Sequence, residues 1–249
     1  MVKLNMDSIE FNIMAACETS HWWFFGRRVI LASVFNKLVR KKNNLILDIG
    51  CGTGGNIGFL KSYGCVSAVE PNSHAISIAK NKGFHDIKKG SLPDLFPTFD
   101  KKFDIICLFD VLEHLENHQE GLVLCRKMLK IDGKVVITVP AFNFLWSQHD
   151  EVHNHKRRYT KADIFDLISE ANLNVVYCSY FNFILFPVIF FMRFWKRFLN
   201  LKNKSDLKKQ NQFLNTILKH VFSFERFLIP RLNLPFGVSI IVVAQNSSN

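Results

Sequence analysis

The sequence lacks a C-x-x-C pair, although it holds six cysteines in 249 residues. These cysteines are scattered and most lie in apolar runs, which indicates reduced core thiols and excludes a disulfide framework or a standard zinc site. The N-terminus also lacks a basic segment followed by an unbroken apolar run, so a secretory signal is not expected. Together these absences favour a cytoplasmic protein.

The sequence has no internal repeat and no apolar run long enough to cross a bilayer, which takes roughly 20 residues. The most apolar stretch, "FILFPVIFFMRFWKRFL" at 183–199, is interrupted by Pro187 and Arg193. A transmembrane helix is therefore not expected there.

Composition predicts one globular domain with an insertion, since 48% of the residues are hydrophobic and 21% are charged. The formal charge of +11 and the pI near 9.4 favour an anionic partner. Nucleic acid, a phospholipid surface and a phosphorylated substrate all fit that charge.

From residue 44 onward, short β-rich runs alternate with amphipathic segments of helix length, which predicts βαβ units and a parallel sheet. Gly64 and Gly83 stand where left-handed helix C-caps belong, and Thr160 with Asp163 forms a capping-box pattern. The expected strands are 45–48, 66–70, 85–89, 103–109, 134–139, 174–180 and 237–245. The expected helices are 55–63, 72–82, 116–129 and one that begins after Thr160.

The stretch "LILDIGCGTGGNIGFL" predicts a buried strand that enters a glycine-rich turn and opens a helix, an arrangement that binds ligands through backbone amides. Gly50, Gly52 and Gly55 satisfy G-x-G-x-x-G and Glu70 follows about 20 residues later, so a nicotinamide dehydrogenase is one interpretation. Asp48 argues against it, because its carboxylate would repel a pyrophosphate. A ligand with an ammonium or sulfonium cation would suit Asp48 better.

At this loop the chain resembles the class I S-adenosylmethionine (SAM)-dependent methyltransferases, whose D-x-G-x-G-x-G pattern is matched by Asp48, Gly50, Gly52 and Gly54. The resemblance implies an α/β Rossmann-like fold with a mostly parallel seven-stranded sheet and an antiparallel last strand. It implies SAM as cofactor and S-adenosylhomocysteine as product, with Glu70 binding the ribose hydroxyls. The implied cofactor-binding residues are Asp48, Gly50, Cys51, Gly52, Gly54, Glu70, Pro71, Ser91, Leu92, Asp110, Val111 and Arg28.

Histidines near the end of the fourth strand and after the fifth are the candidate bases. Methyl transfer to oxygen requires removal of a proton, and we expect His114, His153 and His155 to be catalytic. The phrase "DVLEH" also resembles ubiquinone-pathway O-methyltransferases, which implies Asp110, Glu113 and His114 as ligands of a divalent metal. The histidine spacing matches no standard zinc pattern, and a metal is not expected.

Three further segments, "ETSHWWFFGRR", "PAFNFLWSQHDEVHNHKRRYT" and "LPFGVSIIVVAQ", resemble a bacterial methyltransferase group associated with polysaccharide or lipid-linked glycan assembly. Trp22, Trp23 and Phe24 either form an aromatic lid over the cofactor or belong to a helix that docks on the sheet. Arg27 or Arg28 would then pair with the methionine carboxylate. The expected substrate-binding residues are Trp146, Arg157, Arg158 and Tyr159, with the two arginines either a clamp for a substrate phosphate or solvated charge before a helix.

The insertion at 183–236 contains two amphipathic helical patterns joined by the basic segment "KNKSDLKK". On the first, Arg193, Lys196 and Arg197 share a narrow stripe opposite aromatic residues; on the second, Lys219 and Arg226 lie opposite Phe213 and Phe224. Such helices lie in a membrane interface. Peripheral membrane contact through 183–228, a pocket lid and a dimer interface are the three interpretations.

The expected organisation is a single domain: an N-terminal helical lid at 1–43, a Rossmann-like core at 44–182, the helical insertion at 183–236, and a last strand with tail at 237–249. The expected function is SAM-dependent methyl transfer, favouring oxygen, to a small or lipid-linked acceptor. The alternatives are an NAD-dependent oxidoreductase and a non-catalytic SAM-binding protein. Nucleic acid is not an expected partner, because "FDVLEH" stands where an N/D-P-P-Y tetrapeptide would follow the fourth strand.

Overall fold

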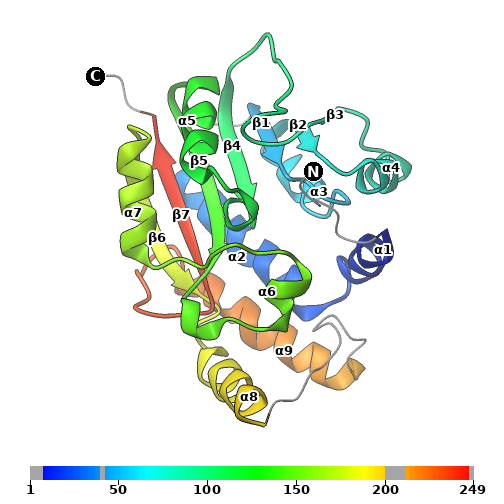
Figure 1. The fold of residues 1–249 in the computed structure, drawn as a ribbon, viewed down its shortest axis with the longest axis vertical. Coiled ribbons are helices and arrows are strands. Elements are labelled where there is room, and N and C mark those ends of the chain that lie inside the picture. The colour runs from blue at the N-terminus through cyan, green and yellow to red at the C-terminus, as the bar shows by residue number, and fades with distance from the viewer. Residues whose placement is uncertain (1–7, 40–42, 200–210, 247–249) are drawn as a thin grey trace.

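The computed structural model describes residues 8–39, 43–199 and 211–246. Its centre is a seven-stranded sheet in the order β3-β2-β1-β4-β5-β7-β6. Only β7 runs antiparallel to its neighbours, β5 and β6, while the other pairs are parallel. This confirms the predicted fold class (Figure 1). The strands are β1 (Asn44–Ile49), β2 (Gly64–Glu70), β3 (Ile87–Lys89), β4 (Phe103–Phe109), β5 (Leu129–Pro140), β6 (Asn174–Phe181) and β7 (Ser239–Gln245).

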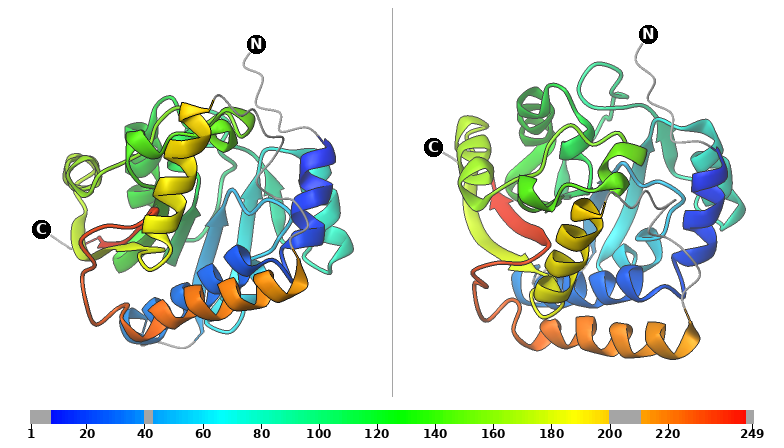
Figure 2. Two further views of the ribbon diagram at one scale, coloured as in Figure 1. Left: turned by 90° about the horizontal axis from the view of Figure 1, so that it is seen from below. Right: turned by 60° about the horizontal axis from the view of Figure 1, so that its bottom comes forward.

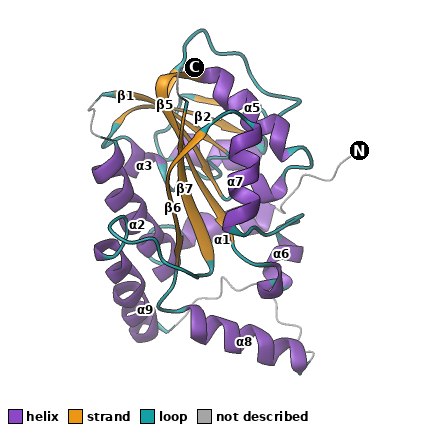
Figure 3. Ribbon diagram, turned by 90° about the vertical axis from the view of Figure 1, so that its left-hand side faces the viewer, coloured by secondary structure: helices purple, strands orange, loops and turns teal. Residues whose placement is uncertain are grey.

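Helices cover both faces of the sheet, as Figure 3 shows. Alternate residues of each strand point to opposite faces, so Leu47 joins the core beneath α5 and α7 while Ile46 joins the core beneath α2 and α9. The helices are α1 (Ser8–Cys17), α2 (Trp22–Leu38), α3 (Ile57–Leu60), α4 (Ser73–Asn81), α5 (His118–Met128), α6 (Gln148–Val152), α7 (Lys161–Glu170), α8 (Phe186–Phe198) and α9 (Gln212–Phe224). Three 3-10 turns are η1 (Leu112–His114), η2 (Asn143–Leu145) and η3 (Glu225–Phe227).

Most local predictions are confirmed. Thr160 caps α7: its backbone nitrogen donates to the Asp163 carboxylate, and its hydroxyl oxygen accepts from the Asp163 backbone nitrogen, as a capping box requires. Gly83 has the left-handed backbone expected of a C-cap, with φ of +87°. Gly64 does not: it begins β2, where an added Cβ would meet the Asn44 carbonyl oxygen at 2.0 Å. The helix expected at 55–63 is also shorter, since only Ile57–Leu60 is α-helical.

The insertion forms the two predicted helices. α9 runs alongside α2, where Trp22 packs edge to face on Phe222 at 5.6 Å between ring centroids. α8 lies apart from the sheet and contacts η2, which follows β5 (Figure 2). The basic segment expected between them, 200–210, lies outside the described residues. Within the described ranges, no helix has the length and apolar content needed to cross a membrane.

Candidate active site

The turn after β1 forms the cofactor cradle. Gly50, Gly52 and Gly54 all adopt positive φ, at 74°, 55° and 84°, which glycine tolerates best. A Cβ on Gly50 would meet Val111 at 2.7 Å, so the backbone passes close to the segment after β4. Both the backbone conformation and this close packing therefore require glycine at position 50.

Asp48 ends β1 as a buried carboxylate with 1% exposure. Among the described residues its Oδ2 has no hydrogen-bond partner. Burial raises the pKa of Asp48 to about 7, although nearby Arg27 opposes the rise. An orphaned buried carboxylate at the end of β1 fits a cationic ligand, as the sequence predicted.

Glu70 ends β2 and faces the same loop. One oxygen accepts from the backbone nitrogen of Gly52 at 2.8 Å and the other from that of Asn72 at 3.0 Å. Burial raises the pKa of Glu70, and these two backbone bonds oppose the rise. Its role toward the ribose hydroxyls stays a prediction.

The remaining predicted cofactor residues follow the strand ends. Ser91 and Leu92 come after β3, beside Glu70, whose carbonyl oxygen accepts from Gly90 at 3.2 Å. Asp110 follows β4 with φ of 58°, and its carboxylate accepts from Thr138 at 3.0 Å and pairs with Arg27. Cys51 is buried in the loop, and Pro71 follows Glu70. The structure therefore gathers these residues along the carboxyl ends of β1 to β4.

The aromatic residues at the beginning of α2 pack on other parts of the protein. Trp22 packs against α9, and Trp23 lies over the guanidinium of Arg27 at 4.5 Å. Arg28 donates to the Glu18 carbonyl oxygen at 2.5 Å, so Arg27 is the arginine that faces Asp48 and Asp110. The expected pairing of Arg28 with the cofactor carboxylate has no support in this geometry.

Glu18, between α1 and α2, lies on the glycine-rich turn and was missed from the sequence. Its carboxylate accepts from the Thr53 hydroxyl and pairs with Lys82 at 2.7 Å. A Cβ on Gly55 would come within 2.6 Å of it. The contact joins residues 35 positions apart, and no local pattern signals it.

The three predicted catalytic histidines come together, with His149 as a fourth member. Ring centroids lie 4.7 Å apart for His114 and His155, 6.1 Å for His153 and His155, and 4.1 Å for His149 and His153. Burial, with help from His155 and His153, lowers the pKa of His114 to about 3. Burial likewise lowers the pKa of His149 well below its usual range. Both rings are therefore neutral near pH 7, the form that accepts a proton or binds a metal.

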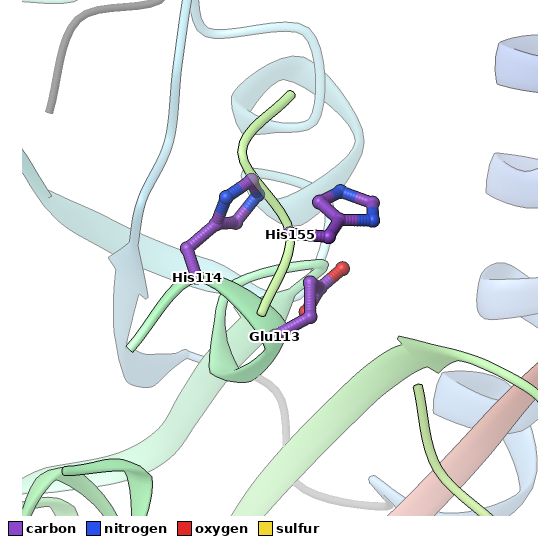
Figure 4. Close-up of side chains that lie close together, drawn as sticks. All are labelled: Glu113, His114 and His155. Carbon is purple, nitrogen blue, oxygen red and sulfur yellow. The ribbon is translucent and has the colours of Figure 1, made fainter. Parts of the chain in front are cut away.

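Glu113, His114 and His155 also form the group that could hold a metal ion. One ligand atom from each lies within 4.8 Å of the other two (Figure 4). Burial, followed by the charge of Asp110, raises the pKa of Glu113 well above its usual range. Asp110, the third ligand that the "DVLEH" resemblance implied, is instead engaged by Arg27 and Thr138.

Two predicted substrate residues are buried and paired. Arg158 donates to both oxygens of Asp150, at 2.8 and 2.9 Å, and to the Ala141 carbonyl oxygen at 2.9 Å. The Tyr159 hydroxyl lies 2.9 Å from Nδ1 of His118, and the residue is 2% exposed. Both therefore hold the loop after β5, which corrects the expectation of an open phosphate clamp at Arg158.

Two further predicted substrate residues remain accessible in part. Arg157 is half-buried and donates to the Glu116 carbonyl oxygen at 3.2 Å, and Trp146 is half-buried after η2. Their contact with a substrate stays a prediction.

Comparison with known proteins agrees with this geometry. Residues 47–137 match the family model described as a methyltransferase domain. The chain is 29% identical over 144 residues to the uncharacterized protein MJ1123 of Methanocaldococcus jannaschii, covering 57% of this chain and 67% of that one. It is 22% identical over 149 residues to the ubiquinone biosynthesis O-methyltransferase of Rickettsia typhi, covering 52% and 60%.

Among solved structures, the plantazolicin methyltransferase BpumL in complex with S-adenosylhomocysteine has the same fold, with a TM-score of 0.61. That likeness covers 96% of this chain and 90% of the other at 14% identity. Residues 47–137 thus match a methyltransferase domain, and the fold and the glycine-rich turn agree with an enzyme that uses S-adenosylmethionine as its cofactor. The NAD-dependent interpretation of the glycine-rich loop is thereby set aside.

Proposed function

We propose that this enzyme transfers the methyl group of SAM to an oxygen atom of a hydrophobic, lipid-linked acceptor that it meets at a membrane surface. SAM supplies a methyl group on a sulfonium, so the protein's task is to align the acceptor, exclude water and remove a proton. Asp48 and Glu70 hold the cofactor side, and the histidine group lies on the acceptor side.

The histidine group supports an oxygen acceptor, because a hydroxyl must lose its proton during transfer. Burial lowers the pKa of His114 to about 3, which makes it a weak base, so we assign the proton to His153 of the same group. The Rickettsia relative is named as an O-methyltransferase, which agrees with this choice.

The observation that carries the membrane proposal is the direction of α8. Arg193, one of its basic residues, turns toward the protein and donates to the Leu145 carbonyl oxygen at 2.5 Å. Several of its apolar side chains turn outward instead: Val188, Phe191, Met192, Phe194 and Trp195 are 53–67% exposed. A contiguous apolar face of this kind marks an interaction surface.

This outward face connects to the site through aromatic side chains of η2. Phe144, which is 54% exposed, packs on Phe190 of α8 at 5.8 Å and stacks on Phe142 at 4.9 Å. The chain from η2 leads directly into α6 and His155. The charge of Arg193 on α8 also contributes to the lowered pKa of His149, so α8 lies near the histidine group, and an acceptor with an apolar tail on α8 would be held close to it.

The second helix presents a similar face. Leu218, Val221 and Phe222 of α9 pack toward α2, while Phe213, Ile217 and Phe224 are 75%, 42% and 54% exposed. The overall charge of +11 complements an anionic lipid surface. Two helices with outward apolar faces on a basic protein match interfacial binding.

Co-sedimentation with phosphatidylglycerol and phosphatidylcholine vesicles at low and high salt tests the proposal. We expect salt-sensitive binding to the anionic vesicles, and at least a tenfold loss in a variant with Phe191→Ser, Phe194→Ser and Trp195→Ser. The matched control is Ile131→Ser, which removes a side chain that is 70% exposed near the opposite end of β5. Equal binding by the triple variant and the control would contradict a membrane role and leave a lid or dimer surface.

A further inference from the structure

Glu113 is the group in the site that the proposed methyl transfer does not explain. It lies in η1, directly after β4, and has 0% exposure. Among the residues that the structure describes, neither of its side-chain oxygens has a hydrogen-bond partner. Burying a charged carboxylate without a partner is unfavourable in free energy, so this group must either carry a proton or bind a cation.

Two imidazoles border this carboxylate. His114 is the next residue, and His155 comes from the loop after α6, 41 positions further on, with its ring edge to face against that of His114 at 81°. Figure 4 shows the three side chains converging. Their ligand atoms lie within 4.8 Å of one another, and ligand atoms bound to one tetrahedral ion at about 2.1 Å lie about 3.4 Å apart. Closing the set around an ion therefore takes a change of at most about 1.4 Å in any of these distances.

His155 is also oriented as metal-binding histidines are. Its Nδ1 donates to Oδ1 of Asp150 at 2.8 Å, which leaves the Nε2 lone pair for a ligand. Arg158 in turn donates to both oxygens of Asp150. The hydrogen bonds from His155 and Arg158 hold the pKa of Asp150 well below its usual range, although burial opposes this. A carboxylate behind the imidazole fixes the tautomer and raises the basicity of the ligand nitrogen.

We propose that Glu113, His114 and His155 bind one divalent transition-metal cation. Two imidazole nitrogens and one carboxylate suit Zn²⁺ or Mn²⁺, whereas Mg²⁺ prefers oxygen ligands and retained water. The set differs from the one that the "DVLEH" resemblance implied, because His155 takes the place of Asp110. That replacement follows from the engagement of Asp110 by Arg27.

The charges of the surroundings agree with such an ion. Arg158 is paired with Asp150 and Arg27 with Asp110, so neither guanidinium pairs with Glu113, which would bind the ion as a carboxylate with one negative charge. A divalent cation would leave one positive charge, which an oxygen anion of the acceptor would neutralise. Here the inference rests on the proposed transfer to oxygen: the ion would lower the pKa of the acceptor hydroxyl.

The chemistry then balances without another reactant. The hydroxyl proton passes to the imidazole of His153, which is not a ligand of the proposed ion, and the oxygen lone pair forms the new C–O bond. The S–C bond breaks at the same time, and its electrons remain on sulfur, which leaves the thioether product.

Metal titration of the full-length protein tests the site directly. After removal of metal with EDTA and of EDTA by dialysis, calorimetric titration with ZnCl₂ and with MnCl₂ should show one saturable site, with MgCl₂ at least tenfold weaker than Zn²⁺. Glu113→Gln and His155→Gln should each weaken Zn²⁺ binding at least tenfold. The control His85→Gln removes an exposed histidine elsewhere and should leave the affinity unchanged.

SAM binding by the same variants separates folding from metal binding. Glu113→Gln should retain SAM affinity within about threefold while it loses the metal. Absence of a saturable site in the wild-type protein, or equal Zn²⁺ affinity in Glu113→Gln, would overturn the metal site. Loss of vesicle binding alone would overturn only the membrane proposal, since metal titration needs neither vesicles nor an acceptor.

Discussion

Arg158 holds both carboxylate oxygens of Asp150, from Nε at 2.8 Å and from Nη2 at 2.9 Å. The pair is buried, with 5% exposure for Arg158 and 0% for Asp150. Because His155 donates to the same carboxylate, the pair fixes both the loop after β5 and one imidazole of the site. An arginine that sequence reasoning gave to substrate thus orients the protein's own histidine.

Replacing Arg158 with lysine should therefore destabilise the fold. A lysine ammonium cannot make the two parallel bonds of a guanidinium. We expect Arg158→Lys to lower the free energy of unfolding in urea by roughly 2–4 kcal/mol, as for a broken buried ion pair. Arg157→Lys is the control. Arg157 is half-buried, and its side chain donates a single hydrogen bond within the described residues, to the Glu116 carbonyl oxygen. Similar losses for the two variants would contradict this role.

The unpartnered carboxylate of Asp48 should make the stability of the cofactor-free protein depend on pH. Its pKa is about 7 in the folded protein against 3.8 as reference, so the folded state binds more protons between those values. Stability from this group is therefore complete below about pH 4 and is lost as the pH rises through 7. Asp48→Asn should be more stable than the wild type at pH 8 by up to about 4 kcal/mol, because the shift spans about three pH units, and the difference should shrink steadily toward pH 4.

Urea unfolding without SAM at pH 4.5, 6 and 8 measures this difference. We expect the same variant to bind SAM at least tenfold more weakly at pH 8, since the carboxylate that suits the sulfonium is gone. If Asp48→Asn has the same dependence of unfolding free energy on pH as the wild type, and the same SAM affinity, then Asp48 is neither a buried carboxylate nor a cofactor ligand.

The sequence predicted those parts of the molecule that depend on local pattern. Short β-rich apolar runs located the strands, and the spacing of Asp48 and Gly50 located the glycine-rich turn after β1. Thr160 and Asp163, three positions apart, form the predicted capping box. These signals are local because each arises within one strand, turn or helix end.

Contacts between distant segments could not be predicted in the same way. Glu18 meets Thr53 across 35 positions, and Gly64 was taken for a helix cap because nothing nearby reveals the close approach of Asn44. The direction of α8 is a further case. Its sequence shows an amphipathic helix, but only docking on η2 determines that Arg193 turns inward and Phe191 outward.

Gly26 offers a test of the packing that holds α9 on α2. Alanine is normally favoured over glycine inside a helix by about 1 kcal/mol. At Gly26, however, a Cβ would lie 2.3 Å from Cδ1 of the buried Phe222. We expect Gly26→Ala to destabilise the protein by about 1–3 kcal/mol despite its better helix propensity.

Gly58 provides the matched control, because it is also helical and, within the described chain, a Cβ there would meet no atom within 4 Å. Gly58→Ala should stabilise the protein by about 0.5–1 kcal/mol. Thermal unfolding of both variants gives the comparison, and a gain at Gly26 would show that α9 does not pack on α2 as described.

Glu225 joins the end of α9 to the beginning of α8. Its two oxygens accept from the backbone nitrogens of Asn182 at 2.7 Å and Ile184 at 2.9 Å, and it is 0% exposed. Glutamine keeps the shape but offers one oxygen and an NH₂ group, which would face a backbone donor. Glu225→Gln should lower the free energy of unfolding by about 1–3 kcal/mol.

The same substitution should loosen the base of α8 without altering its outward face. Hydrogen exchange at residues 182–190 should be faster in Glu225→Gln, while exchange in the β1 and β4 core stays slow. Glu151→Gln, at an exposed glutamate of α6, should change neither stability nor exchange. If Glu225→Gln leaves exchange at 182–190 unchanged, the insertion is held mainly by the aromatic contacts of Phe144 and Phe222 and not by this carboxylate.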